Sequence, residues 1–448
     1  MEDKIVTLSN LKVKGLYGNY DYNVNFNSDV TLLYGTNGCG KTTILNIISS
    51  IITGNLYRLF SYGFNEIGLS YFLLSDRRKK GYILLNKISN DVIKIKFRNS
   101  EYNIEKIQVS EDKRRRIDSS DEIYFEVYPV LNEIRKEFNF VFLALNRVAA
   151  ISNADDFYYM NRRRLFMEDR IIEPEQIDPE IRYIENLIYR RYMNVTTVTN
   201  TINNDFRNSI LKSALDVNVQ TDLEKFLNDF NLNALKKSDI SKIKDSYMRI
   251  LNDLKIISAE EKQQYAFFFE EYSKLLKGVG NKIELKEMFA LFIAYNEMKK
   301  IQGIVDIADE TEKQKAKVLR PIELFLDTVN EFISSSDFKK KIEINMNGRV
   351  YFKTEDNENN LSIQFLSSGE RQLIIFFANL IFGVDDTTSG IFVVDEPELS
   401  LHLSWQRVFV KKALEVNNNV QFIFATHAPE IISNFRNKTE QLQRIEVK

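Results

Sequence analysis

The chain has 448 residues, more than one average domain needs, and this length suits two or three structural units. Its 44% hydrophobic residues, 28% charged residues and net charge of −2 are ordinary for a globular protein and exclude a global basic field for nucleic acid. A single cysteine excludes an intramolecular disulfide, and no apolar run approaches the ~18 residues of a membrane helix. We therefore expect a cytoplasmic protein that makes no use of a membrane.

The first 150 residues are predicted to be rich in β-structure. Alternating or apolar segments in residues 4–34 predict strands, and a glycine-dense loop and a helix at 42–52 follow them. Three β-rich segments between residues 66 and 108 predict a meander, and residues 141–145 predict a short buried strand. This part therefore contains a strand, a glycine loop and a helix in direct succession.

The middle of the chain has a different pattern. No proline lies between residues 181 and 320, and residues 222–235, 259–276 and 283–302 show helical periodicity. Charges of both signs are interspersed, as on solvated helix faces. We interpret residues 151–340 as a helical insertion, without a repeat or a sustained heptad array.

After Pro321 the pattern changes again. Asn347-Gly348 between two β-rich segments predicts a hairpin, residues 355–360 a polar loop, and 361–365 a strand. An apolar helix at 373–382 and buried strands at 391–394 and 420–425 follow. Residues 1–150 and 341–448 are thus predicted to form one α/β nucleotide-binding domain, with a mixed central sheet and an antiparallel β subdomain, which the insertion splits in sequence.

The strongest motif is the glycine loop at residues 35–43. It consists of Gly35, Thr36, Asn37, Gly38, Cys39, Gly40, Lys41, Thr42 and Thr43. This matches the P-loop pattern, in which backbone N–H groups and a helix N-terminus bind phosphate, the lysine reaches the β- and γ-phosphates, and Thr42 ligates Mg²⁺. The alternatives are a plain glycine turn and, for Cys39, a redox sensor rather than a small spacer. We predict an ATP and Mg²⁺ site.

Two adjacent acids end the buried strand at 391–394. Asp395 and Glu396 would be costly at the end of an apolar strand without a cation nearby. Asp395 is therefore predicted to hold Mg²⁺ together with Thr42, and Glu396 to activate the attacking water as general base. Together with the P-loop, this pair predicts an ATPase.

Residues 366–372 resemble the signature sequence of ABC ATPases. The resemblance implies that Ser367 and Gly369 of one subunit contact the γ-phosphate bound to the P-loop of another, and therefore a head-to-tail dimer or higher oligomer. Ser368 and Glu370 stand where the commonest signature has Gly and Gln. The alternative is an ordinary helix capped by Ser367 or Ser368.

Two further segments extend this resemblance. Residues 396–402 with Trp405 and Gln406 look like the D-loop region of ABC ATPases related to RecF, SMC, Rad50 and overcoming-lysogenization-defect (OLD) proteins. We expect His402 in this segment to be structural. His427 follows the strand at 420–425. By resemblance it is the switch histidine of ABC ATPases, which contacts the γ-phosphate; the alternative is a structural histidine. The resemblance covers residues 1–145 and 340–435.

Other positions remain open. The family has a glutamine after a strand between P-loop and signature, where this chain has Asn146, a possible Mg²⁺ ligand, and Arg147. For Tyr17 and Tyr20 there are two interpretations: one of them stacks on adenine, or both belong to the core. The basic clusters at 113–116 and 162–164 have three interpretations: contacts to nucleic-acid phosphates, solvated loops with salt bridges, or contacts to an acidic partner.

The resemblance also predicts what the ATPase does. A helical insertion in a split head, with no nuclease domain after His427, looks like the stand-alone ATPases of bacterial anti-phage systems such as PARIS, Septu and some retrons. It implies a nucleotide-controlled scaffold for a separate effector, a nuclease or toxin encoded nearby, released by a phage-derived trigger. The alternatives are a DNA-repair ATPase that binds duplex and, third, a transport-associated subunit.

Overall fold

The computed structural model describes most of the chain. The described residues are 6–73, 76–107, 120–138, 140–143, 149–151, 179–215, 226, 237–254, 258–278, 284–334, 339–383 and 390–446. They belong to two compact units, Met1–Tyr192 with Pro321–Lys448, and Met193–Arg320. The limits between the units fall inside two long helices, α7 (Pro179–Leu215) and α11 (Leu285–Ile333).

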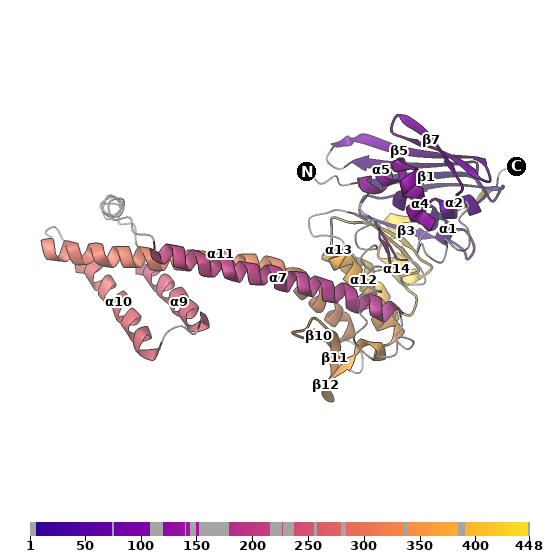
Figure 1. The fold of residues 1–448 in the computed structure, drawn as a ribbon. Helices are drawn as coiled ribbons and strands as arrows, with labels where there is room; N and C mark the ends of the chain where they lie inside the picture. Colours follow the sequence, from indigo (N-terminus) through magenta and orange to yellow (C-terminus); the bar gives the residue numbers. More distant parts are fainter. Residues whose placement is uncertain are drawn as a thin grey trace. The chain divides into compact units, whose positions relative to one another are not determined.

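The first unit is built on a mixed sheet whose strands come from both ends of the chain (Figure 1). In spatial order these strands are β15 (Thr439–Gln441), β3 (Val30–Tyr34), β14 (Gln421–Ala425), β13 (Ile391–Asp395), β8 (Phe140–Leu143) and β9 (Ala149–Ile151). All neighbours are parallel except β8 and β9. Strands β13 and β14 are buried along their whole length, which explains their continuous apolar sequences.

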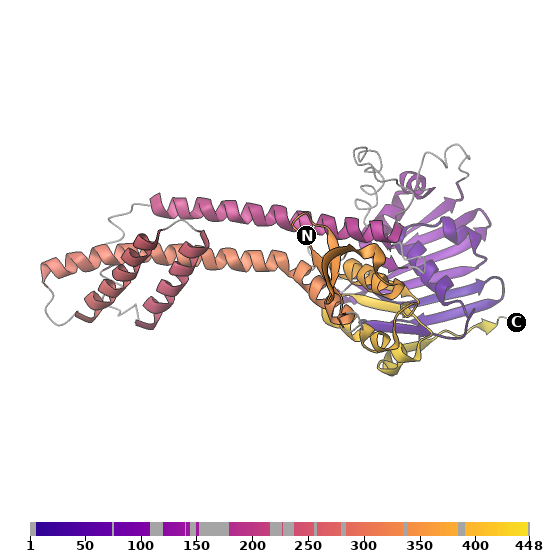
Figure 2. The same cartoon turned by 90° about the horizontal axis from the view of Figure 1, so that it is seen from below.

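A second, antiparallel sheet lies against one face of this central sheet. Its order is β16 (Ile445–Glu446), β2 (Tyr20–Asn25), β1 (Val6–Leu16), β4 (Glu66–Leu73), β5 (Asp76–Ser89), β6 (Val92–Phe97) and β7 (Ser100–Glu105). Figure 2 shows its strands side by side. Helices α1 (Lys41–Thr53) and α5 (Pro129–Glu137) share one hydrophobic core with both sheets, to which Leu33, Val393 and Ile423 of the central sheet contribute.

The opposite face of the central sheet is covered by helices. Phe392, Phe422 and Phe424 point to this side and pack with α12 (Ser368–Phe382) and α13 (Leu403–Val416). The same core includes the first turns of α7, the last turns of α11 and the small sheet of β10 (Lys341–Ile344), β11 (Val350–Thr354) and β12 (Asn357–Ser362). A hydrogen bond from the Tyr183 hydroxyl to the buried Asn379 joins α7 to α12.

Shorter elements connect these parts of the first unit. They are α2 (Tyr57–Ser61), α4 (Ser120–Val127), α14 (Pro429–Ser433) and the 3₁₀ turns η2 (Ile363–Phe365) and η3 (Arg436–Lys438). The second unit is helical: α9 (Lys237–Leu254) and α10 (Ala259–Gly278) pack with α11 around Tyr247, Phe269 and Met298. The structure contains no helix, within its described residues, with the length and apolar character needed to span a bilayer.

The predicted fold class is confirmed: a mixed central sheet, an antiparallel sheet and a helical segment between the two sequence halves. Two local predictions differ from the structure. Helix α11 extends well beyond the predicted helical segment at 283–302 and continues through Pro321, where the carbonyl that loses its partner belongs to the exposed Lys317. Strand β12 begins at Asn357 inside the predicted polar loop, because its pairing with β11 outweighs its polar composition, and residues 363–365 of the predicted strand form the turn η2. Most of the predicted helix at 222–235 lies outside the described residues, and the domain limits at 150 and 340 stay a prediction.

Candidate nucleotide-binding site

Three adjacent strands of the central sheet end at one edge, and each is followed by a predicted site segment. In the register of the sheet, Leu33 of β3 is level with Ala425 of β14, which is level with Asp395 of β13. Backbone hydrogen bonds continue beyond the strands, from the Glu396 N–H to Ala425 and from the Thr426 N–H to Leu33. Parallel topology therefore brings residues 35, 396 and 427 to the same edge, where open α/β sheets bind ligands.

The glycine loop after β3 has the curled backbone that a phosphate cradle needs. Gly38 and Gly40 have φ angles of 77° and 103°, which residues with a Cβ rarely adopt. Gly40 is the N-cap of α1, and a Cβ there would lie 2.9 Å from the Tyr22 hydroxyl, which itself donates to the Cys39 carbonyl at 3.0 Å. A Cβ on Gly38 would meet nothing within 4 Å, so the crest of the loop is open.

Lys41 begins α1 and is only 5% exposed. Its ammonium donates to the carbonyls of Gly35 at 3.1 Å and Thr36 at 3.4 Å, so the side chain lies across the loop. The buried Cys39 thiol is 3.9 Å from the same nitrogen. These contacts hold Lys41 across the loop, in the position predicted for a cation that binds phosphate, and Cys39 fits the predicted small spacer.

Asp395 is a buried acid whose carboxylate oxygens have no hydrogen-bond donor among the described residues. It is 4% exposed, and neither of its carboxylate oxygens accepts a hydrogen bond within the described part of the chain. Burial raises the pKa of Asp395, as do Glu396 and Glu398, while the nearby Thr42 hydroxyl and Lys41 lower it. A buried carboxylate with free oxygens beside a threonine hydroxyl fits a Mg²⁺ ion, which takes few protein ligands and keeps phosphate and water oxygens.

Glu396, the predicted general base, has an unusual backbone. Its φ angle is 50°, a left-handed conformation that is uncommon for a residue with a Cβ. The carbonyl of Glu396 accepts the Leu399 N–H at 3.1 Å, which starts a tight turn directly after the strand. The turn keeps the Glu396 side chain partly exposed, whereas Asp395 is buried next to it.

His427 lies beside the P-loop lysine. Its Nδ1 is 3.4 Å from the Lys41 ammonium, although 386 residues separate them in sequence. Because an ammonium group can only donate, Nδ1 must accept, which leaves the hydrogen of a neutral ring on Nε2. His427 therefore has a donor available on the side away from Lys41, as a phosphate contact requires.

Sequence reasoning missed Glu398, which contacts the segment before and at His427. Its Oε1 accepts the His427 backbone N–H at 2.6 Å, and its Oε2 accepts the Thr426 hydroxyl at 2.9 Å. Its place two residues after Glu396 was the available signal, but only the parallel pairing of β13 and β14 reveals the partner.

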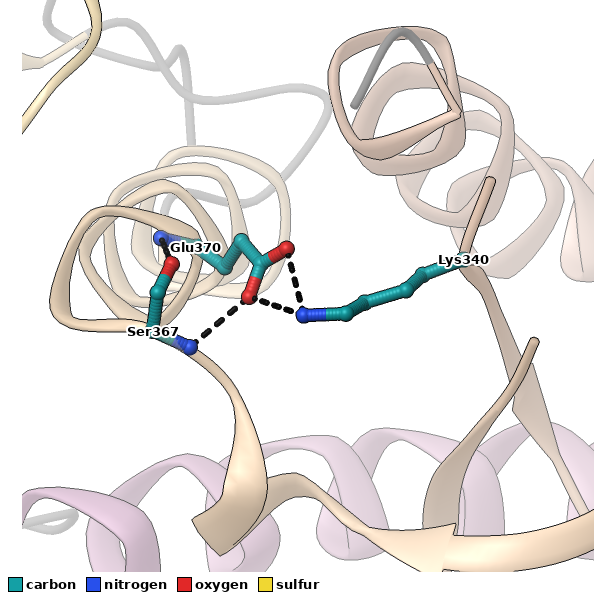
Figure 3. Close-up of polar contacts among 3 residues, drawn as sticks. All are labelled: Lys340, Ser367 and Glu370. Carbon is teal, nitrogen blue, oxygen red and sulfur yellow. Dashed lines mark hydrogen bonds and ion pairs between the residues drawn. The ribbon is translucent and has the colours of Figure 1, made fainter. Parts of the chain in front are cut away.

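The signature segment forms the capped N-terminus of α12 (Figure 3). Ser367 and Glu370 make a capping box, with the Ser367 N–H donating to Oε2 of Glu370 at 2.7 Å and the Glu370 N–H donating to Oγ of Ser367 at 3.3 Å. The Lys340 ammonium donates to both oxygens of Glu370 at 3.0 and 2.9 Å. The carboxylate that replaces the usual glutamine thus has a cationic partner, and Ser367 and Ser368 are exposed.

The turn after Glu396 packs directly on this helix end. A Cβ on the buried Gly369 would lie 2.3 Å from the Ser400 carbonyl oxygen, so only glycine fits there. The Gln372 amide also donates to the Pro397 carbonyl at 3.3 Å. Within one chain, the signature segment therefore contacts the turn at 397–400.

Several predicted positions have other surroundings. His402 caps α13 by accepting the Ser404 N–H, the structural role expected for it. Tyr17 is 55% exposed and contacts Tyr62 edge-on, while Tyr20 packs under the Arg444 guanidinium. Asn146, Arg147 and the basic clusters at 113–116 and 162–164 lie outside the described residues.

Comparison with known proteins identifies the family. The model of the family described as "AAA ATPase domain" matches residues 7–432. The "Retron Vc95 probable ATPase" of Vibrio cholerae serotype O1 biovar El Tor is 26% identical over 125 residues, which are 26% of this chain and 24% of that protein. The "Retron Ec83 probable ATPase" of Escherichia coli is 32% identical over 88 residues, 17% of this chain and 16% of that protein. The matches thus span a quarter or less of either relative.

Among solved structures, the Smc head domain of Pyrococcus furiosus with an extended coiled coil, bound to the C-terminal domain of ScpA, aligns over 99% of this chain and 96% of its own. The identity is 12% and the TM-score 0.41, so the family assignment rests on the sequence match. That match covers almost the whole chain and includes the P-loop, the acidic strand end and the histidine. The chain therefore belongs to the AAA ATPase domain family.

Proposed function

We propose that this protein hydrolyses ATP and works as a nucleotide-controlled switch of the ABC type. The observation that carries the proposal is the meeting of Lys41, Asp395 and His427 at one edge of the central sheet. A cation for phosphate, a buried acid with free oxygens and a ring N–H donor are the groups that phosphoryl transfer to water requires. Their sequence order supports the same conclusion.

Each residue has a role in the proposed reaction. The N–H groups of the loop at 35–43 and the Lys41 ammonium bind the phosphates. To reach them, Lys41 gives up its hydrogen bonds to the Gly35 and Thr36 carbonyls. Thr42 and Asp395 would hold Mg²⁺, which would supply positive charge at the phosphates. Glu396 accepts a proton from the attacking water, and His427 donates from Nε2 to the γ-phosphate.

A second copy of the chain completes the site in this proposal. The Ser367 and Ser368 side chains are exposed at the N-terminus of α12, where the partial positive charge of a helix favours an anion. Binding of this helix end to the triphosphate of another copy makes closure of the oligomer depend on ATP. A partner that prefers the open or the closed state is then held or released as ATP is bound and hydrolysed.

The partner we propose is a separate effector encoded nearby in a bacterial anti-phage system. The names of the two relatives reported above, both retron probable ATPases, support this assignment. The role of the helical segment between the sequence halves is, in this proposal, to contact the effector or its trigger. The alternative function is that of a DNA-repair ATPase, and the experiment on the switch described below distinguishes the two.

The catalytic part is tested with Lys41→Ala and Glu396→Gln. We expect Lys41→Ala to lose ATP binding, and Glu396→Gln to bind ATP, hydrolyse it about 10²–10⁴-fold more slowly and accumulate as a dimer or higher oligomer with ATP and Mg²⁺. Phosphate release and light scattering measure these effects. Glu430→Gln, which neutralises an acid of α14, serves as the control with unchanged turnover. Normal hydrolysis by Glu396→Gln would exclude Glu396 as the base.

The switch is tested by co-expression with the product of the adjacent gene. Co-purification that responds to ATP in the unmodified protein and is lost in Lys41→Ala supports a regulated effector complex. A monomer whose binding partners do not change with ATP contradicts it. A salt-sensitive gel shift with duplex DNA, weakened when Arg114 to Arg116 are neutralised, identifies the DNA-repair alternative instead.

A further inference from the structure

Glu398 is a partly buried carboxylate to which the reaction proposed above gives no role. Both of its oxygens accept hydrogen bonds from the segment that follows β14, one from the His427 backbone and one from the Thr426 hydroxyl. The Thr426 hydroxyl in turn accepts the Ala428 N–H at 3.0 Å. A single side chain therefore determines the backbone path through three consecutive residues, the middle one of which is the predicted phosphate contact.

Glu398 is itself held in place from the opposite side. The amide of Gln406, a buried residue of α13, donates to the Leu401 carbonyl at 3.0 Å and to the Glu398 carbonyl at 3.4 Å. The Leu401 N–H closes the turn by donating to the Glu398 carbonyl at 3.0 Å. Because the backbone of Glu398 is fixed by these hydrogen bonds, its side chain can hold His427 in a defined position.

The same turn carries Glu396 at its first residue. A shift of the turn that moved Glu398 would therefore also move the general base, and a shift of His427 would pull on both. The hydrogen bonds to Glu398 thus join the group that activates water to the group that contacts the phosphate. A positional error of about 1 Å in such a pair is enough to lower turnover about 100-fold.

We propose that Glu398 is a positioning residue that sets His427 against the γ-phosphate and keeps it in register with Glu396. This inference rests on the proposed function, because it requires that His427 contact the nucleotide. The simpler alternative is a purely structural role, in which Glu398 satisfies backbone and hydroxyl donors without affecting turnover. The two differ in whether the effect of Glu398 depends on the His427 ring.

Four variants separate the hydrogen bonds. Glu398→Gln keeps one acceptor oxygen and should lower kcat about 10-fold, whereas Glu398→Ala loses both acceptors and should lower it about 100-fold. Thr426→Val removes only the hydroxyl and should resemble Glu398→Gln, and Thr426→Ser should recover most of that loss. The Kd for a fluorescent ATP analogue should change less than about threefold, since residues 35–43 supply most of the ground-state binding.

The decisive experiment combines Glu398→Ala with His427→Ala. If Glu398 acts through His427, the double variant hydrolyses ATP at the rate of His427→Ala alone, within about twofold. If the two losses multiply, Glu398 acts independently of the ring and the inference is overturned while the role of His427 stands. If His427→Ala alone keeps normal turnover, the assignment of His427 in the proposed function fails, and the inference with it.

Hydrogen exchange provides a readout that does not depend on activity. Loss of the acceptor should make the backbone amide of His427 exchange about 10-fold faster in Glu398→Ala than any loss of global stability, measured by denaturant titration, accounts for. Glu430→Gln, which neutralises a neighbouring acid, should alter neither the exchange nor kcat. If Glu398→Ala does not fold, Thr426→Val carries the same double-variant test with His427→Ala, and losses that multiply there would overturn the inference. In Thr426→Val the amide to follow is that of Ala428, which loses the Thr426 hydroxyl as its acceptor and should exchange faster.

Discussion

The carbonyl oxygen of Ser400 lies where a side chain of residue 369 would begin: a Cβ on Gly369 would approach it to 2.3 Å. Ser400 itself has a φ angle of 66°, so the backbone on the other side of the contact is also constrained. The N-terminus of α12 and the turn after Glu396 are thus in contact within one chain. Gly369 has a structural reason to be glycine that does not depend on nucleotide.

Gly369→Ala should destabilise the protein. The methyl group forces the turn at 397–400 or the start of α12 to move, at a cost of about 1–3 kcal/mol in the free energy of unfolding. Urea denaturation measures the loss. Ser368→Ala, at the adjacent exposed position, should change stability by no more than about 0.5 kcal/mol. Equal stability of the two variants would show that the backbones are not in contact at Gly369.

Lys340→Met should leave a buried carboxylate without its cation. The side chains of Lys340 and Glu370 are 15% and 4% exposed, and removing one partner of such a pair costs about 3–5 kcal/mol. Glu370→Gln in the Lys340→Met background should recover most of the loss, because no unpaired charge remains. Denaturant titration of the single and double variants measures the coupling.

The neighbouring residue offers a matched control for this pair. Lys339 forms an ion pair with Glu355 at 2.7 Å, but both side chains are more than 60% exposed. Lys339→Met should therefore cost no more than about 1 kcal/mol. If Lys339→Met and Lys340→Met destabilise the protein equally, burial does not set the strength of the Lys340 pair.

Asp395→Asn should stabilise the protein in a pH-dependent manner. The pKa of Asp395 is raised by burial above the unfolded value of about 3.9, so the native state binds the proton more tightly than the unfolded state does. The native protein then loses stability as pH rises from the unfolded pKa through the native one. The advantage of Asp395→Asn over the unmodified protein should be small near pH 4 and grow to a plateau at higher pH. A constant difference across this range would contradict the raised pKa.

Mg²⁺ should stabilise the unmodified protein more than it stabilises Asp395→Asn. If Asp395 holds the ion, Mg²⁺ with ATP raises the Tm of the unmodified protein more than that of Asp395→Asn. Thermal unfolding with ATP, with and without Mg²⁺, measures this difference. An equal response of the two proteins to Mg²⁺ would remove Asp395 from the ligand set.

Gln421→Met should weaken the contact between the two large sheets. The buried Gln421 side chain accepts the Leu8 N–H at 2.7 Å and donates to the carbonyls of Leu8 and Asn27 at 2.8 and 2.7 Å. A methionine of similar size leaves these backbone groups unpaired, so we expect a loss of at least about 2 kcal/mol in denaturant titrations. Gln441→Met, at an exposed position of β15, should be neutral within about 0.5 kcal/mol, and a similar result for Gln421→Met would contradict this role.

The parts of the site that follow one another in sequence were predictable. Apolar runs before the glycine loop and before Asp395 predicted buried strands, and the loop carries its own pattern for phosphate. The hairpin around Asn347-Gly348 was predictable for the same reason, since its turn is encoded locally; the turn closes with the Gly348 N–H donating to the Asn345 carbonyl. The role expected for His427 came from the resemblance to ABC ATPases, and the parallel pairing seen in the structure brings it to the same edge as Lys41 and Asp395.

The remaining features depend on partners that are distant in sequence. The pairing of Lys340 with Glu370 and of Glu398 with His427 requires knowledge of which elements are neighbours. Proline is unfavourable inside a helix, yet α11 continues through Pro321 because packing of residues such as Phe325 and Val329 in the core outweighs one lost hydrogen bond. Composition alone contains no information on such contacts.

The strand order of the central sheet has a consequence for synthesis on the ribosome. Strand β3, which carries the glycine loop, is flanked by β14 and β15, and about 390 residues separate Tyr34 from Gln421. At about 5–20 residues per second, the nascent chain needs about 20–80 s to produce these neighbours. The backbone N–H and C=O groups along both edges of β3 therefore lack these partners for most of translation, and a chain interrupted before β14 cannot complete the sheet around the glycine loop.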